Sequence, residues 1–192
     1  MGGIMSIVLQ GSTSGSVTLQ EPAVAGTTVL DLPAVSGTIL TTTSPKAGNV
    51  LQVVQASTTT RVQITNSTYV DTNLTASITP SSSSSKILVL ISQNIGTFNS
   101  SQVGTAGNLR IVRDSTTVFT SENVISIVAA LGNASEVRVA GQYAFNYLDS
   151  PATTSSVTYK TQANLSSGGG RVEPQSNNGT SNSTIILMEI AG

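Results

Sequence analysis

Glycine recurs at a constant spacing of eleven near the start of the chain, and no other feature constrains the fold as much. Gly15, Gly26, Gly37 and Gly48 open the units GSVTLQEPAVA, GTTVLDLPAVS, GTILTTTSPKA and GNVLQVVQAST. Each unit continues with β-prone residues, and the first three then reach a proline, which has no backbone N–H to donate and so ends or bends a strand. Each unit is therefore predicted to form one short strand and a turn.

Strands this short cannot bury an apolar face on their own. The aliphatic side chains that would need cover are Val17, Leu19, Val29, Leu32, Ile39 and Val50. We expect other copies of the chain to cover them, so that residues 1–55 form a stalk or attachment segment. The alternative is a β-meander in which these strands pack on the following domain of the same chain.

From about residue 56 the pattern changes to longer runs separated by turn residues, at the spacing of a sandwich or barrel. Strands are expected at 61–64, 74–78, 86–93, 109–113, 117–120, 124–131, 136–147, 155–163 and 184–190. No segment sustains the 3.6-residue apolar period of a helix, although 124–131 could be read either way. The predicted class is all-β, with the 11-residue repeats followed by an antiparallel, jelly-roll-like sandwich over residues 56–192.

Two kinds of apolar pattern distinguish the expected strands. Tyr143, Phe145 and Tyr147 occupy alternate positions, which predicts one buried face for their strand. Residues 87–91 and 185–188 are apolar without a break, as in strands covered on both sides, either inside a sandwich or between subunits. Gly, Ser and Asn cluster at 96–107 and 166–183, which predicts long loops that could present a recognition surface.

The inventory of side chains excludes much chemistry. The chain has no His and no Cys, so Ser-His-Asp and Cys-His arrangements and imidazole or thiolate metal sites are excluded. Its nine carboxylates form no recognisable pair in the sequence, and a carbohydrate-cleaving activity is the one enzymatic alternative retained. The Gly-rich segment 167–171 lacks the Gly-Lys-Ser/Thr ending of a phosphate loop and is predicted to be a flexible hairpin loop. We predict no enzyme, no cofactor and no metal.

The charge of the chain and the composition of its first residues indicate which partners and which compartment to expect. Only 9% of residues are charged and the net charge is −1, so nucleic acid is not an expected partner. The mostly apolar stretch 4–9 has no basic flank and is too short for a signal peptide or membrane insertion, so synthesis and release in the cytosol are expected.

Several phrases resemble segments of tail-fibre and other virion proteins of marine and cyanobacterial bacteriophages. They are SIVLQGSTSGSVTLQEPAVAGTTVLDLPAVSGTIL, GNVLQVVQ, SITPSSSSSKILVLIS and STIILMEIAG. The resemblance implies a virion structural protein assembled in the host cytoplasm, a homotrimer whose repeats attach or form a shaft and whose sandwich points outward. Its expected partners are itself, other virion proteins and a host-surface glycan or protein. The alternatives are a capsid decoration or cement trimer and, as an enzyme, a capsule-degrading depolymerase.

Overall fold

The computed structural model describes residues 6–20, 46–99, 104–127, 136–176 and 180–192. The chain divides into two compact units, Met1–Ile39 and Leu40–Gly192, and the second is called the body below. This division falls earlier than the expected boundary after residue 55, because strand β3 (Val50–Thr58) pairs with the last strand of the body. The fourth repeat unit therefore contributes its strand to the sandwich.

The described part of the first unit is a two-stranded antiparallel hairpin. Strands β1 (Ser6–Gln10) and β2 (Ser16–Gln20) pair with Leu9 opposite Val17. Gly15 begins the first repeat unit with φ of 78°, a left-handed conformation that glycine adopts without steric cost. The expected pattern of a glycine followed by a short strand is thus observed in this unit.

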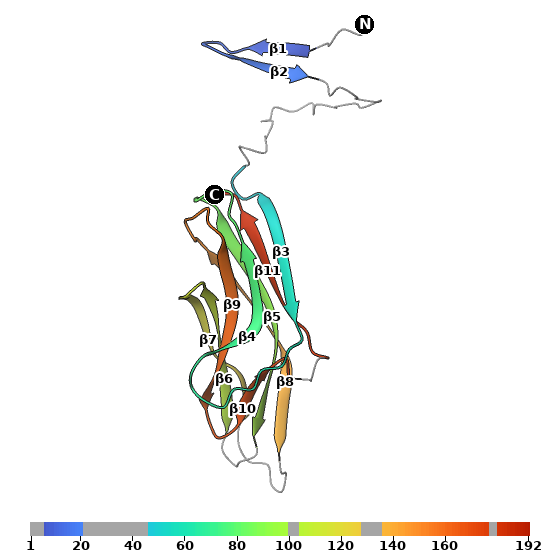
Figure 1. Cartoon of the computed structure of the whole chain (residues 1–192), viewed down its shortest axis with the longest axis vertical. Helices are drawn as coiled ribbons and strands as arrows, with labels where there is room; N and C mark the ends of the chain where they lie inside the picture. The colour runs from blue at the N-terminus through green and yellow to red at the C-terminus, as the bar shows by residue number, and fades with distance from the viewer. Residues whose placement is uncertain (1–5, 21–45, 100–103, 128–135, 177–179) are drawn as a thin grey trace. The chain divides into compact units, whose positions relative to one another are not determined.

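The body contains two antiparallel sheets (Figure 1). Besides β3, its strands are β4 (Val70–Ile78), β5 (Lys86–Asn99), β6 (Thr105–Arg113), β7 (Thr116–Ile127), β8 (Val137–Asp149), β9 (Val157–Ser167), β10 (Arg171–Pro174) and β11 (Ser183–Ile190). In the five-stranded sheet, β8 pairs with one edge of β5. The other edge of β5 pairs with β11 at Lys86–Ser92 and with β10 at Ile95–Phe98, and β3 pairs with the far edge of β11. The four-stranded sheet has the order β4-β9-β6-β7.

The order of these strands defines a jelly roll. If the short β10 is set aside and the remaining body strands are numbered 1 to 8 along the chain, the five-stranded sheet reads 1-8-3-6 and the four-stranded sheet reads 2-7-4-5. Strands that follow one another in sequence mostly alternate between the sheets, as two interleaved Greek keys require. The prediction of an all-β, antiparallel sandwich is confirmed, and no described residue is helical.

Two apolar clusters fill the space between the sheets. One contains Ile87 and Val89 of β5 with Ile185 and Leu187 of β11, and Phe145 and Tyr147 of β8 pack against it. The second contains Ile95, Leu109, Leu165 and Val172. The inward face predicted for β8 from its alternating aromatics is therefore correct.

A belt of polar side chains lies between the two clusters. Gln93 follows Ile91 and precedes Ile95 on the inner face of β5, and Thr161 holds the corresponding place on β9. Thr161 Oγ1 donates to Gln93 Oε1 at 2.8 Å, and Gln93 Nε2 donates to Ser183 Oγ at 2.9 Å. A slip of either sheet would leave these buried groups unpaired, so the belt fixes the register between the sheets.

Some strand predictions need correction. The sequence predicts separate strands at 117–120 and 124–131, but β7 runs without a break through 117–127, and 128–131 lie outside the described residues. The expected strand 61–64 is absent from the described pairing except for an isolated bridge between Ile64 and Val172. Both corrections follow from long-range pairing. β6 pairs along β7, whereas, among the described residues, the backbone of 61–64 bonds to β10 only through the Val62 N–H, which donates to the Pro174 carbonyl, and through that bridge.

The two long loops predicted from Gly, Ser and Asn content contain more strand than expected, and their segments 100–103 and 177–179 lie outside the described residues. β5 continues to Asn99 and β6 begins at Thr105, so most of 96–107 is strand. Within 166–183 the chain forms β10, whose Val172 is fully buried and pairs with Thr97. The polar composition of these segments misled the prediction, because Val172 joins the second core cluster and Phe98 and Ala106 are also buried.

Candidate interaction surface

The outer face of the five-stranded sheet carries rows of aliphatic side chains. Cross-strand register aligns Leu148, Leu88, Met188 and Val53 in one row across β8, β5, β11 and β3. In the adjacent row Leu90 lies opposite Ile186. Because side chains alternate between the faces of a strand, these residues point away from the core that their neighbours fill.

We call this set the outer apolar patch, and its members are Val53, Leu88, Leu90, Leu148, Ile186 and Met188. Val53 is 55% exposed and Leu148 is 49% exposed, while the other four are partly exposed. The unbroken runs at 87–91 and 185–188 were predicted to be covered on both sides. Their inner faces are buried in the sandwich, and no other described element of the body covers their outer faces.

The outer face of the four-stranded sheet has the opposite chemistry. Lys160 Nζ donates to Asp71 Oδ2 at 2.8 Å, Gln162 Nε2 donates to Asp71 Oδ1 at 2.6 Å, and the Arg110 guanidinium donates to Gln162 Oε1. Burial raises the pKa of Asp71, but the hydrogen bonds from Lys160 and Gln162 outweigh it and hold the pKa below its ordinary value. This face is suited to water, and the outer apolar patch is not.

The first unit has an uncovered apolar face as well. Ile7 is 63% exposed, Leu9 56% and Val17 62%, and Ile7 lies opposite Leu19 in the register of the hairpin. Residues 6–20 contain no charged side chain. Aliphatic residues without cover are thus found in both units of the chain.

The structure places only some of the side chains expected to form a contact between copies. Val17 is exposed in the hairpin, and Val50 is 49% exposed at the start of β3, opposite Ile190. The backbone of Leu19 pairs in β2. Val29, Leu32 and Ile39 lie outside the described residues.

The Gly-rich segment 167–171 is a close-packed turn between β9 and β10. Gly168 has φ of 92°, and a Cβ on Gly170 would lie 1.9 Å from the carbonyl oxygen of Phe98. Arg171 turns back into the body, where its Nε donates to Glu173 Oε1 at 2.7 Å and its guanidinium lies over the Phe98 ring. The segment has a structural role here, and the flexible loop expected from its composition is not what the packing shows.

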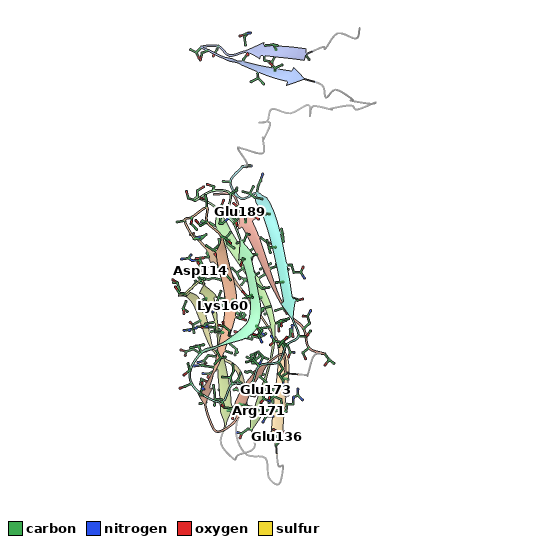
Figure 2. All side chains as sticks on the ribbon, viewed as in Figure 1. Asp114, Glu136, Lys160, Arg171, Glu173 and Glu189 are labelled. Carbon is green, nitrogen blue, oxygen red and sulfur yellow. The ribbon has the colours of Figure 1, made fainter. Side chains whose placement is uncertain are left out.

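A charged cluster surrounds this turn. Figure 2 shows Arg171, Glu173 and Glu136 together at one end of the body, away from Glu189. Glu173 is fully buried and also accepts from Gln63 Nε2 at 2.8 Å, and Arg171 pairs with Glu136 at 3.2 Å. Glu173 Oε2 accepts no hydrogen bond from the described residues and lies 3.8 Å from Arg61 Nη1. The cluster therefore links β10 to the segment 61–63 and to Glu136, which directly precedes β8.

Other buried carboxylates are held in the same way. Asp149 Oδ2 accepts from Arg113 Nη1 at 2.6 Å and from the Tyr159 hydroxyl at 2.7 Å. Glu189 accepts from the backbone N–H and hydroxyl of Ser81 and from Gln52. In the part of the chain that the structure describes, no group of His, Cys, Asp and Glu could hold a metal ion.

The described fold is thus a jelly roll with a polar sheet face, an apolar sheet face and an uncovered N-terminal hairpin. Within the described ranges no helix is long and apolar enough to cross a membrane. No protein-family model matches the sequence, and no curated protein matches it significantly.

Solved structures resemble the chain only distantly. VP2 in the infectious bursal disease virus subviral particle is 16% identical with a TM-score of 0.36, and the match covers 92% of this chain and 47% of that one. The structure of T=1 particles derived from the same virus is 13% identical with a TM-score of 0.33, and the match covers 96% of this chain and 44% of that one. Dimeric latent PorU from Porphyromonas gingivalis is 10% identical with a TM-score of 0.33, and the match covers 76% of this chain and 14% of that one. The chain spans less than half of each of these proteins, and likenesses at this level carry no functional conclusion.

Proposed function

We propose that this chain is a non-enzymatic structural subunit of a virus particle, and more narrowly a homotrimeric short fibre or tail-associated appendage of a bacteriophage. The uncovered, uncharged hairpin is the observation that carries the proposal. A two-stranded hairpin is marginally stable in water by itself. A segment of this composition needs a permanent partner, and a subunit of an assembled particle has one.

Sequence and fold support the proposal in different ways. The phrases that resemble segments of phage virion proteins occur at both ends of the chain and at the start of the sandwich. Jelly rolls occur in viral capsid proteins and also in lectins and cupins, so the fold is compatible with this function without selecting it. In this proposal the N-terminal segment joins copies and attaches them to the particle, and the body carries any contact with a host-surface glycan or protein.

One observation favours the decoration or cement protein as a second candidate. The edge of β3 that faces away from β11 pairs with no other described strand. A free edge can join the sheet of a neighbouring coat protein by strand addition. A decoration protein repeats with the capsid lattice and reaches copy numbers on the order of hundreds, whereas an appendage is present in tens at most.

The test is to purify the particles of the virus that encodes this sequence and to measure the chain by gel densitometry and mass spectrometry. We expect the chain in the particles, in tens of copies. Copy numbers in the hundreds would contradict the appendage and favour a decoration protein. Absence of the chain from purified particles would contradict the whole proposal. When the pure chain is incubated with capsular polysaccharide, the viscosity of the polysaccharide solution should stay unchanged. A fall in viscosity would refute the proposal that the chain is not an enzyme.

A further inference from the structure

We infer that the outer apolar patch is the surface through which the bodies of neighbouring copies of this chain contact one another. The inference rests on the proposed homomeric assembly and assigns it a second surface, separate from the N-terminal repeats. The starting point is a contrast in chemistry, because the outer face of the four-stranded sheet carries the Lys160–Asp71 ion pair, whereas the patch consists of aliphatic rows. The ion pairs of Arg171 belong to the five-stranded sheet but lie on β10, which pairs with β5 at Ile95–Phe98, beyond the patch.

The size of the patch fits a contact between proteins. Six aliphatic side chains with the observed exposures present on the order of 300 Å² of apolar surface, which is within the range of patches that mark interaction sites. Gln55 and Asn146 flank Ile186 and Leu90 in the same row. With such polar neighbours, the patch has the apolar centre and polar rim that are typical of an interface between proteins.

The charge of the patch favours another copy of the same chain as the occupant. None of its six members is charged, and Lys86, at the end of β5 opposite Ile190, is the one charged residue of β5. Two copies of this face can therefore approach without placing like charges opposite one another. The net charge of −1 adds little long-range repulsion between copies.

The position of the patch makes such a contact compatible with the fold. It spans β8, β5, β11 and β3, which lie side by side in one sheet, so all its members move as one rigid surface. Copies already joined through their N-terminal segments would meet at a high effective concentration, and an interface of modest area is then sufficient.

Cysteine cross-linking tests this surface directly, because the chain contains no cysteine of its own. Leu88→Cys places a thiol at the centre of the patch, and Ser77→Cys places a matched thiol on the exposed outer face of β4. Each full-length variant is treated with a short bis-maleimide after its mass has been measured by sedimentation. We expect an oligomeric mass for both and at least fivefold more cross-linked product for Leu88→Cys.

A charge inside the patch provides the second measurement. Val53→Glu should lower cross-linking of the Leu88→Cys chain several-fold, whereas Thr75→Glu on the other sheet should leave it unchanged, with far-UV circular dichroism confirming that both fold. If the mass is oligomeric but cross-linking is equal at positions 88 and 77, or if Val53→Glu has no effect, the patch is not the contact surface. The proposed homomeric assembly is then not contradicted. A monomeric mass would overturn both.

Discussion

Replacing Gly170 by alanine tests how the Gly-rich turn is packed. The added Cβ would lie 1.9 Å from the carbonyl oxygen of Phe98 and 2.7 Å from Thr105 Oγ1, and real Cβ contacts are essentially never under 3.0 Å. The φ of Gly170 is not positive, so the expected cost is purely steric. β5 and the turn would have to separate by about 1 Å, and overpacking of this kind costs about 1–3 kcal/mol.

We expect the upper end of that range, about 3 kcal/mol, because the shift also moves Phe98 away from the guanidinium groups of Arg138 and Arg171 that lie over its ring. For a domain of this size, that loss lowers Tm by roughly 6–12 °C. The assay is urea unfolding of the full chain followed by far-UV circular dichroism, at one fixed protein concentration because association contributes to stability.

Gly141 provides the matched control within the same sheet. It lies in β8, and a Cβ there would meet nothing within 4 Å. Gly141→Ala should therefore be neutral or stabilise by up to about 1 kcal/mol, since alanine loses less backbone entropy in a strand. If Gly170→Ala unfolds at the same urea concentration as Gly141→Ala, the turn is loose and the packing described above is wrong.

Three further predictions concern the body. Leu187→Ala should cost about 2–5 kcal/mol by leaving a cavity in the core, whereas Met188→Ala, one residue further on the outer face, should cost much less in urea unfolding of the dilute chain. Tyr159→Phe removes the hydroxyl that donates to Asp149 and should cost about 1–2 kcal/mol in the same assay. Burial raises the pKa of Glu189, but its hydrogen bonds outweigh burial and hold the pKa below the ordinary 4.5. The stability that Glu189 contributes is therefore fully present above pH 4.5 and is lost as the pH falls through the folded-state pKa. Unfolding free energies measured from pH 6 down to 2 should fall less steeply in Glu189→Gln than in the parent chain.

The class of fold and the inner faces of the longest strands could be predicted from the sequence. Alternating aromatics identify the inward face of β8, and the unbroken runs identify the two central strands β5 and β11, because burial acts on side chains in a period of two. That no other described element of the body covers the outer face of those strands could not be predicted. An unbroken apolar run indicates cover on both sides and does not say which molecule supplies it.

Segments rich in small and polar residues were harder to predict. β10 has one large apolar side chain, Val172, and forms because β5 offers it an edge and the second core cluster offers Val172 a place. The strand order of the jelly roll was likewise beyond sequence patterns, since β3 and β11 pair across most of the chain. Such pairings depend on partners far away in sequence, which local propensity does not encode.

The 11-residue repeat shows where local and long-range effects separate. Gly15 and Gly48 both open their units with positive φ, 78° and 89°, and a strand follows each of them. The local conformation is therefore the same in both units, as the repeat predicts. Their partners differ, because β2 pairs with β1 in a hairpin and β3 pairs with β11 in the body. In the two described units, a strand with an aliphatic face forms after Gly15 and after Gly48, and the strand that pairs with it is determined by what lies within reach.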